Sequence, residues 1–401
     1  MPNKKILIIV NKCPYPAIDG TKYKILNNIA DGVYQDFLVD FLIITHEKVS
    51  QDQIDYLENR FNKVMVFRIS KPLLVFRMFL GLFTKLPLQV FAFYNKHANS
   101  FVKENINQYD TAYIHTMRMT EYFINLPEKV RSKVVVDMND AFSLNYKDAK
   151  IKAKFPLNIF FSFEYLRSLK YEKKILSNFF NINIITQKDK KYVLNSAGDI
   201  SHIKNFTCIP HGVPDKLISR TPVPNKNQIV FVGNLSYEPN RDGVQFFLEN
   251  IWLKLKQKNP HLELIIIGGG DTSNFPKEDG VIFKGFVEDI YPYIETSALS
   301  IAPIRFGAGM LSKVTESMAL GVPVITTPLG ASGIEGFINE QNVIIVDEFN
   351  IDGWVNKITE VLNNPEKQKM LGHNARQIVK EKYIESSVQK QFLDLFKSSI
   401  N

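Results

Sequence analysis

The stretch IPHGVPDKLISRTPVPNKN (residues 209–227) separates two parts of the chain that repeat one sequence pattern. Its prolines and turn residues are typical of a linker between domains. On both sides of it, short runs rich in valine and isoleucine alternate with segments of helical length. Such continuous apolar runs predict parallel strands that are buried on both faces of a sheet. The runs span residues 5–10, 37–45, 63–69, 111–116, 133–138 and 182–187 before the linker, and 228–233, 262–270, 280–285, 298–303, 322–327 and 342–347 after it.

This repetition predicts an α/β protein built from two Rossmann-like, doubly wound domains that face each other across a cleft. We expect the N-terminal domain over residues 1–210, the linker over 211–227 and the C-terminal domain over 228–380. The tail, residues 381–401, reads as a helix that could pack back on the N-terminal domain. Ligands of such sheets bind beyond the carboxyl ends of the strands, so the loops after the strands are where a site is expected.

Composition narrows the class of protein further. The 401 residues include only two cysteines, Cys13 and Cys208, which excludes a disulfide framework and a cysteine-rich zinc module. Basic residues outnumber acidic ones by 49 to 41, and the net charge of +8 favours anionic partners such as a phosphorylated ligand or a membrane surface. The charge is spread out and no nucleic-acid motif is present, so nucleic acid is not an expected partner. The apolar run Ile6–Val10 is too short for a signal peptide, and we expect a cytoplasmic protein.

Several phosphate and metal motifs are absent from the sequence. It contains no G-x-x-x-x-G-K-[ST], no histidines four residues apart and no Asp-x-Asp. We therefore expect no metal and no cofactor, and any phosphate must be bound by basic side chains, backbone amides and helix dipoles. Gly268 and Gly270 fit only part of a dinucleotide motif, because Ser273 replaces the third glycine. A sharp turn after a strand is the favoured interpretation there.

The segment ALSIAPIRFGAGMLSKVTESMALGVPVITT (residues 298–327) carries the clearest chemical signal. A predicted strand ends in a glycine-containing loop, and a helix is expected from Leu311 to Leu320. A loop of this kind at a helix N-terminus offers amides and a dipole to an anion. Arg305 before the loop and Lys313 in the first turn add positive charge. A cation in a first turn opposes the helix dipole, which is understandable if an anionic ligand lies there.

Glu316 follows Lys313 by three residues. It could reach the hydroxyls of a ribose if a diphosphate lay at the helix tip, or it could form an ordinary ion pair with Lys313 on a solvated helix.

This segment resembles the donor-binding region of retaining GT-B glycosyltransferases of family four, in the branch with G-A-G-M, then Lys, then Glu-[SA]-M-A-x-G-x-P-V. Two departures stand out. The family's first glutamate is replaced by Ala308, and its usual Arg and Lys after the second domain's first strand appear as Asn234 and as Asn240 or Arg241. The other blocks that resemble the family are residues 13–33, 134–143, 209–214, 231–247, 262–270 and 281–294, together with Glu172.

The resemblance implies a metal-independent glycosyltransferase that moves a sugar, with retention, from a nucleotide-diphosphate-sugar to a glycan or lipid-linked acceptor. It implies a role in bacterial surface polysaccharide or glycolipid synthesis. Arg305 and Lys313 would bind the diphosphate and His115 would contact the donor sugar or acceptor, so these three are the candidate catalytic residues. The implied donor-binding residues are Gly20, Gly233, Phe286, Val287, Gly307, Ala308, Gly309, Met310, Leu311, Ser312 and Glu316, with Phe286 and Val287 lining the base.

Other interpretations stay open at this point. His115 could be structural, as a lone histidine at a strand end often is. Asp137 and Asp140 could touch an acceptor, or could cap a helix or turn. The replacement at Ala308 also fits a catalytically inactive binding or regulatory protein of the same fold, and a sugar-nucleotide epimerase is a further alternative.

Two stretches in the N-terminal half, residues 71–96 and 154–174, mix aromatic and basic residues. Neither holds an uncharged run of ~18 residues, so a spanning helix is not expected. Their composition suits helices that lie on the inner face of an anionic membrane, where lipid-linked acceptors reside. Aromatic residues that pack into the core beside a solvated basic edge are the alternative.

Overall fold

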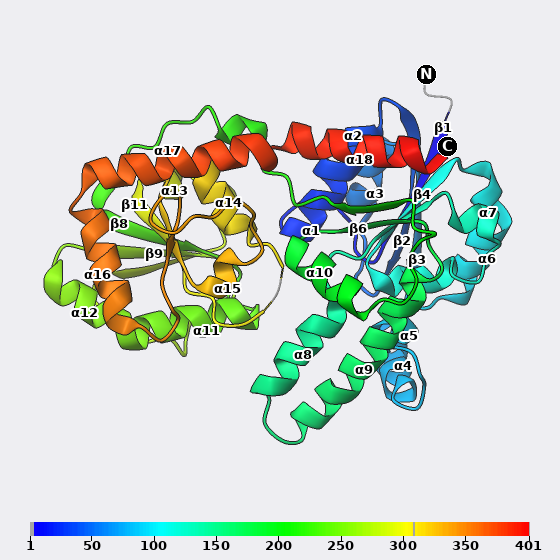
Figure 1. Cartoon of the computed structure of the whole chain (residues 1–401), viewed down its shortest axis with the longest axis horizontal. Coiled ribbons are helices and arrows are strands. Elements are labelled where there is room, and N and C mark those ends of the chain that lie inside the picture. The colour runs from blue at the N-terminus through cyan, green and yellow to red at the C-terminus, as the bar shows by residue number, and fades with distance from the viewer. Residues whose placement is uncertain (1–3, 308, 401) are drawn as a thin grey trace. The chain divides into compact units, whose positions relative to one another are not determined.

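A computed structural model describes residues 4–307 and 309–400 (Figure 1). The predicted donor residue Ala308 lies outside the described residues. The chain forms two compact units, each considered by itself. The first takes in the chain up to Gly212 together with the segment from Glu385 onward, and the second runs from Val213 to Ile384.

The first unit contains a seven-stranded parallel sheet with the order β3-β2-β1-β4-β5-β6-β7. The sequence predicted six of these strands and missed β7. The segment NFTC of β7 is only half-buried at the sheet edge, so it lacks the apolar run that marks the others. The strands are β1 (Lys4–Val10), β2 (Phe37–Thr45), β3 (Lys63–Arg68), β4 (Thr111–His115), β5 (Val134–Asp137), β6 (Asn181–Ile184) and β7 (Asn205–Cys208).

The second unit contains a six-stranded parallel sheet with the order β10-β9-β8-β11-β12-β13. Strand β8 begins at Asn225, inside the segment predicted to be the linker. The sequence did not indicate a strand there because the first residues of β8 are exposed and polar. The strands are β8 (Asn225–Val232), β9 (Glu263–Ile267), β10 (Val281–Gly285), β11 (Ser297–Ala302), β12 (Val324–Thr326) and β13 (Ile344–Ile345). The two doubly wound parallel sheets confirm the predicted fold class.

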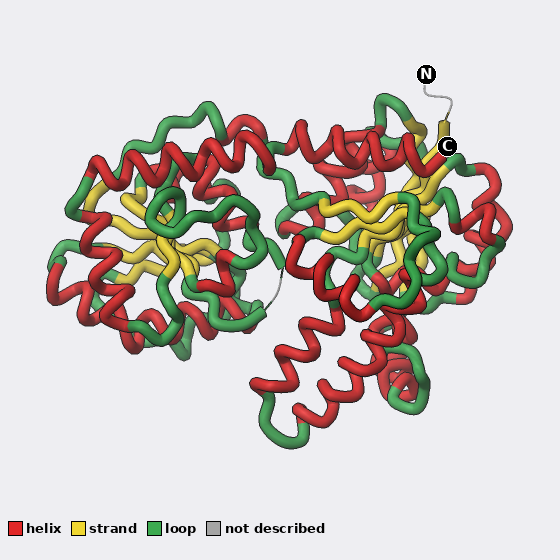
Figure 2. Tube along the Cα trace, in the orientation of Figure 1, coloured by secondary structure: helices red, strands yellow, loops and turns green. Residues whose placement is uncertain are grey.

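Helices cover both faces of each sheet, as the tube in Figure 2 shows. In the first unit they are α1 (Gly20–Tyr23), the π-helix η1 (Lys24–Ala30), α2 (Asp31–Val33), α3 (Gln51–Glu58), α4 (Lys71–Gly81), α5 (Leu88–Ala92), α6 (Lys96–Asn105), η2 (Ile106–Gln108), η3 (Met117–Tyr122), α7 (Glu128–Arg131), α8 (Phe142–Lys152), α9 (Leu157–Leu176), α10 (Gln187–Ser196) and α18 (Glu385–Ile400). In the second unit they are η4 (Asp215–Leu217), α11 (Glu238–Phe247), the π-helix η5 (Leu248–Trp252), α12 (Leu253–Lys258), α13 (Tyr291–Glu295), α14 (Ser312–Ala319), α15 (Pro328–Ala331), α16 (Ile351–Leu362) and α17 (Pro365–Lys382).

The last helix belongs to the core of the first unit. Phe392 and Phe396 of α18 are fully buried and pack in one cluster with Ile6 and Ile8 of β1. The alternate β1 residues Leu7 and Ile9 enter a second cluster on the opposite face of the sheet. This alternation is what a strand buried on both faces requires.

Each sheet has a point at which the strand order reverses. In the first unit it lies between β1 and β4, and in the second between β8 and β11. Connections on either side of such a point lead away from each other and leave room for a ligand at the carboxyl ends of the strands. The residues that follow β1, β4, β8 and β11 are therefore the ones positioned to form a site.

Helices α8 and α9 form an antiparallel pair that extends beyond the sheet of the first unit (Figure 1). None of the helices in the described part of the chain is both long and apolar enough to cross a bilayer.

Candidate functional site

Lys313 lies at the switch point of the second unit. It stands in the first turn of α14, and its ammonium donates a hydrogen bond to Oδ1 of Asn240, in the first turn of α11, at 2.6 Å. The same ammonium lies 4.3 Å from the centroid of the Phe231 ring. Among the described residues it has no carboxylate partner. A half-buried cation that is met only by an amide oxygen and an aromatic ring is free to pair with an anionic ligand.

The backbone around Lys313 is shaped to admit it. A Cβ atom on Gly233, directly after β8, would lie 2.6 Å from the Lys313 ammonium nitrogen. Gly268, after β9, has φ +145°, and a Cβ there would lie 2.0 Å from the carbonyl oxygen of Gly233. The G-x-G after β9 is therefore a sharp turn that brings two strand ends together, and no helix follows it.

Burial changes the acid–base properties of Lys313 and Glu316. It lowers the pKa of Lys313 to about 7, and the charge of Glu316 offsets part of that effect. It raises the pKa of Glu316 to about 7, with Lys313 again opposing. The two side chains do not form the close ion pair that spacing alone allowed, since Lys313 points to Asn240 instead. Each keeps polar atoms available for a ligand.

Arg305 lies in the loop after β11, but its charge already has a partner. Its guanidinium makes a bidentate ion pair with Asp242 of α11, at 2.8 Å from Nε and 2.5 Å from Nη2. It also stacks 4.3 Å from the centroid of Phe246. Arg305 is thus near the predicted anion site, but Asp242 already balances its charge, whereas no carboxylate among the described residues balances that of Lys313.

The loop between β11 and α14 is built from glycines in positive-φ conformations. Gly307 has φ 111° and Gly309 has φ 88°, values that disfavour other residues. Helix α14 begins at Ser312, and Leu311 caps it without any side-chain hydrogen bond. Met310 beneath the loop is buried. First-turn amides that no side chain caps are suited to bind an anion.

The residues predicted to line a base follow β10. Phe286 is 68% exposed and Val287 is half-buried, both at the carboxyl end of the strand. An aromatic ring of this size exposed at a strand end offers a surface for stacking a planar ligand.

In the first unit, His115 ends β4 at the other switch point and is 1% exposed. Its Nδ1 lies 3.1 Å from the hydroxyl of Tyr113. Burial lowers the pKa of His115 to about 3, while Asp137 acts in the opposite direction. The ring is therefore neutral over the ordinary pH range. Gly20, the other predicted residue of this edge, opens α1 behind an Asp19 cap.

Asp137 and Asp140 differ sharply in what surrounds them. Both oxygens of Asp137 are engaged inside the unit, and the side chain is fully buried. Asp140 keeps Oδ1 buried without a hydrogen-bond partner, and burial raises its pKa to about 6. Of the two predicted acceptor contacts, Asp140 is the one with an oxygen to offer.

Sequence reasoning missed several residues at this edge. Lys24 of η1 is fully buried and forms an ion pair with Asp137 at 2.5 Å. Arg118, after β4, stacks between the rings of Phe93 and Phe142, and its Nε donates to Gln89 at 2.6 Å. Nothing in a single sequence marks a lysine or arginine as buried. The only signal for Arg118 was its place just after a strand that ends in a candidate residue.

No group of three or more His, Cys, Asp or Glu side chains within residues 4–307 and 309–400 is placed to hold a metal ion.

Comparisons with known proteins agree with this architecture. Residues 226–364 match the family model described as glycosyl transferases group 1. An uncharacterised 44.6 kDa protein of the cps region of Klebsiella pneumoniae is 23% identical over 410 residues, covering 98% of this chain and 100% of that protein. The poly(ribitol-phosphate) alpha-N-acetylglucosaminyltransferase of Staphylococcus aureus is 23% identical, covering 76% of this chain and 66% of that protein.

A solved structure shows the same fold over nearly the whole chain. Alr3699/HepE of Anabaena, in complex with UDP-glucose, superimposes with a TM-score of 0.68 at 16% identity and covers 98% of this chain and 99% of that one. The chain thus has the GT-B fold, and its residues 226–364 are similar to the glycosyl transferases group 1 family.

Proposed function

We propose that the protein is a glycosyltransferase that takes its sugar from a nucleotide-diphosphate-sugar bound by the second unit. The observation that carries the proposal is Lys313, a cation at the tip of α14 whose contacts among the described residues are an amide oxygen and a ring. A diphosphate would supply the missing negative charge. Lys313 lies beside Gly233 after β8 and Asn240 of α11, in the region where the resemblance places the family's usual basic residues and this chain has Asn234 and Asn240 or Arg241.

The proposed role of each residue follows from the position of its side chain. Lys313 and the uncapped amides of Ser312 and its neighbour would hold the diphosphate as charge develops on the leaving group. Glu316, one turn further, would accept hydrogen bonds from the ribose. Phe286 would stack on the base. Charge stabilisation by fixed donors of this kind is the basis for proposing that the reaction needs no metal and no cofactor.

The acceptor would bind the first unit. Buried polar atoms without hydrogen-bond partners gather after β4 and β5, namely Thr116 Oγ1, Asn139 Oδ1, Asp140 Oδ1 and Asn145 Oδ1. Unsatisfied buried groups of this kind are costly, and sugar hydroxyls would satisfy them. Arg118, whose guanidinium has no carboxylate within 4 Å among the described residues, would meet an anionic part of the acceptor.

The relatives indicate which substrates to test first. A structural neighbour binds UDP-glucose, and one relative transfers N-acetylglucosamine to poly(ribitol-phosphate). Another relative is named as a capsular polysaccharide biosynthesis glycosyltransferase. We accordingly propose transfer, with retention, to a glycan or lipid-linked acceptor in surface polysaccharide synthesis, carried out at the cytoplasmic face of the membrane.

The direct test is release of nucleoside diphosphate from a panel of UDP-, GDP- and ADP-sugars, with and without glycan and polyprenyl-phosphate acceptors. We expect release that depends on acceptor, survives EDTA and yields the anomeric configuration of the donor. A product that is epimerised donor, or nucleotide binding without any transfer or hydrolysis, would contradict the proposal.

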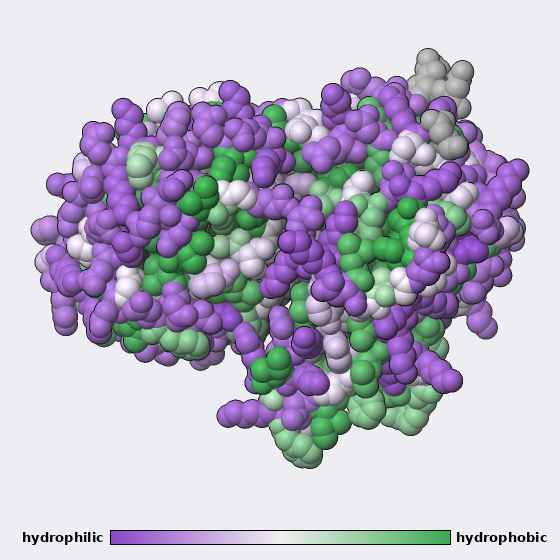
Figure 3. All heavy atoms as spheres, viewed as in Figure 1, coloured by the Kyte–Doolittle hydropathy of each residue, from purple (hydrophilic) through white to green (hydrophobic). Residues whose placement is uncertain are grey.

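The proposed membrane contact rests on an exposed apolar surface of the first unit, here called the α4–α9 surface. Helix α9 is fixed to the segment after α4, because Arg167 donates to the carbonyl of Leu82 at 2.5 Å and Glu164 accepts from the Leu88 amide at 2.9 Å. Hydrophobic side chains gather at the end of the α8–α9 pair (Figure 3). The exposed members are Leu73, Val75, Phe76, Met78, Phe79, Leu80, Leu82, Phe83, Ile151, Phe155, Leu157, Ile159, Phe163 and Leu166.

A patch this apolar is unusual on a protein surface that faces only water. Exposed lysines border it, among them Lys71, Lys85, Lys152, Lys154 and Lys170. Apolar side chains flanked by basic ones match an anionic bilayer interface, where the former enter the acyl region and the latter meet phosphate headgroups.

Co-sedimentation with phosphatidylglycerol-containing and pure phosphatidylcholine vesicles tests this contact. The double variant Phe83→Ser/Phe155→Ser should lose most binding to the anionic vesicles. Val223→Ser in the second unit, a side chain 75% exposed against 78% for each of the two phenylalanines, is the matched control and should bind normally. Equal binding by both variants would contradict the membrane assignment.

A further inference from the structure

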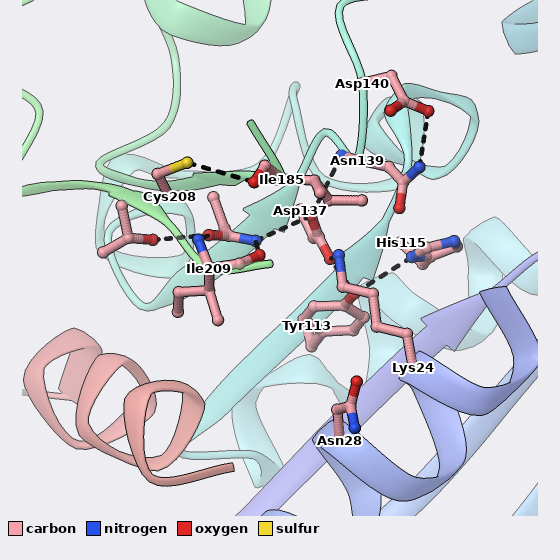
Figure 4. A network of polar contacts seen from close by, with 12 residues as sticks. Lys24, Asn28, Tyr113, His115, Asp137, Asn139, Asp140, Ile185, Cys208 and Ile209 are labelled. Atoms are coloured by element: carbon pink, nitrogen blue, oxygen red, sulfur yellow. Dashed lines mark hydrogen bonds and ion pairs between the residues drawn. The ribbon is translucent and has the colours of Figure 1, made fainter. Parts of the chain in front are cut away.

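The carboxylate of Asp137 is the centre of a buried polar network in the first unit (Figure 4). Its Oδ2 lies 2.5 Å from the Lys24 ammonium and 2.5 Å from the Tyr113 hydroxyl. Its Oδ1 accepts from the amide of Asn139 and the side chain of Asn183, each at 3.1 Å. Lys24, Tyr113 and Asp137 are all fully buried.

The charges in this network decide where its protons lie. A buried carboxylate beside a lysine ammonium is held in its ionised form, and the Lys24 charge, with the donors around Asp137, lowers the pKa of that carboxyl despite its burial. An ionised carboxylate can only accept hydrogen bonds. The Tyr113 hydroxyl has one proton, and at 2.5 Å from the carboxylate that proton is donated to Asp137.

The placement of the Tyr113 proton also determines the tautomer of His115. Because the Tyr113 proton is used on Asp137, the tyrosine oxygen can only accept from the ring nitrogen 3.1 Å away, which is Nδ1 of His115. A neutral imidazole carries one proton, so Nε2 is left with its lone pair. In Figure 4 the second ring nitrogen of His115 points away from the network.

We infer that Lys24, Asp137 and Tyr113 act as positioning residues that fix the proton of His115 on Nδ1 and present Nε2 as a hydrogen-bond acceptor. The group that meets Nε2 must then be a donor, which a sugar hydroxyl is and an ionised phosphate oxygen is not. This last step rests on the proposed function, since it takes the ligand of this edge to be a sugar. His115 thereby selects for a hydroxyl on the bound sugar.

The backbone holds the ring in this orientation. Thr116, the next residue, has φ 66°, a conformation that non-glycine residues rarely adopt, and its amide donates to the carbonyl of Asp137 at 2.8 Å. Lys24 opens the π-helix η1, and unusual turns of this type often occur at functional sites. Backbone in such uncommon conformations persists where the surrounding structure holds it, and it clusters at functional sites.

The tautomer can be read by long-range 15N–1H correlation spectra of histidine-labelled protein, with the His115 signals among the seven histidines assigned by loss in His115→Gln. Wild type should show Nδ1–H. Tyr113→Phe removes the acceptor for that proton and should move the population toward Nε2–H. Tyr109→Phe is the matched control, because Tyr109 makes the same kind of buried bond, to Asp40 at 2.8 Å, away from His115.

Transfer assays on the same variants separate the inference from the proposed function. Tyr113→Phe should lower kcat/KM for sugar transfer about five- to tenfold, the effect of one lost hydrogen bond, and leave UDP affinity unchanged, because UDP lacks the transferred sugar. An Nε2–H signal in wild type, or equal spectra for Tyr113→Phe and Tyr109→Phe, would overturn the inference even if transfer occurs. An Nδ1–H signal in a protein that never releases nucleoside diphosphate would leave the network standing and refute the function.

Discussion

A lysine lies near the switch point of each sheet, and the two lysines differ in whether a carboxylate balances their charge. Lys24 is fully buried and has a carboxylate, Asp137, at 2.5 Å. Lys313 is half-buried, and its hydrogen-bond partner is the amide oxygen of Asn240. The first lysine has its counter-charge inside the fold. The second has no counter-charge in the part of the chain that the structure describes, and burial lowers its pKa to about 7.

This difference in counter-charge indicates a structural role for one lysine and a ligand-binding role for the other. A buried ion pair gives the fold a defined internal geometry, and removing one member leaves a costly unpaired charge. A cation without a counter-charge costs the free protein stability and recovers it only when an anion binds. We therefore assign Lys24 to the architecture that positions His115, and we propose that Lys313 binds the diphosphate.

The largest effect should follow from Lys24→Met. It leaves Asp137 charged and unpaired, and we expect the free energy of unfolding of the first unit to fall by about 3–5 kcal/mol. Urea unfolding followed by circular dichroism measures it. Lys24→Met/Asp137→Asn should recover part of the loss, and Lys313→Met should unfold near the wild-type midpoint. A Lys24→Met variant as stable as wild type would contradict the structural role of Lys24.

The pH dependence of nucleotide binding should be the next largest effect. The pKa of Lys313, about 7, lies below its unfolded value of 10.5, so the free side chain loses its proton as the pH rises through 7. A diphosphate binds the ammonium form, and UDP affinity should fall about tenfold between pH 7 and 8.5. Lys313→Arg stays charged and should bind with a nearly flat profile. Parallel profiles for the two proteins, measured by calorimetry, would exclude Lys313 as the titrating group.

A smaller effect is expected at Arg305, whose charge Asp242 already meets at 2.5 Å. Arg305→Ala should weaken UDP binding only about two- to threefold, as expected for a partly solvated cation with an internal partner. Asp242→Asn releases the guanidinium and should strengthen UDP binding by a similar factor. If Arg305→Ala costs more affinity than loss of Lys313, the ranking of the two cations is wrong.

The sequence predicted the two sheets well because parallel strands buried on both faces leave continuous apolar runs, as β1 and β11 do. It missed β7, which is half-buried at an edge. It also placed a glycine loop and a helix tip around Lys313, and α14 begins at Ser312, one residue after the expected Leu311. These features depend on residues that are close together in the chain.

The sequence could not predict which charged residues pair with each other when they are far apart in the chain. Lys24 meets Asp137 across more than a hundred residues, and Arg305 meets Asp242 across 63. Whether a charged side chain is buried, and which partner it finds, depends on how the strands are ordered in the sheet. For the same reason the sequence allowed Asp137 to be read as an acceptor contact or a cap, whereas its oxygens are used inside the unit.

Nucleotide binding by the second unit should depend most directly on Lys313, which has no carboxylate partner among the described residues. Isothermal titration of UDP, GDP and ADP into wild type and Lys313→Met at pH 7 tests it, with Lys254→Ala, an exposed lysine paired to Asp352, as control. One of the nucleotides should bind wild type and the control equally, and bind Lys313→Met about 10- to 100-fold more weakly, the loss of a hydrogen bond to a charged group. Equal affinity for wild type and Lys313→Met would contradict the account.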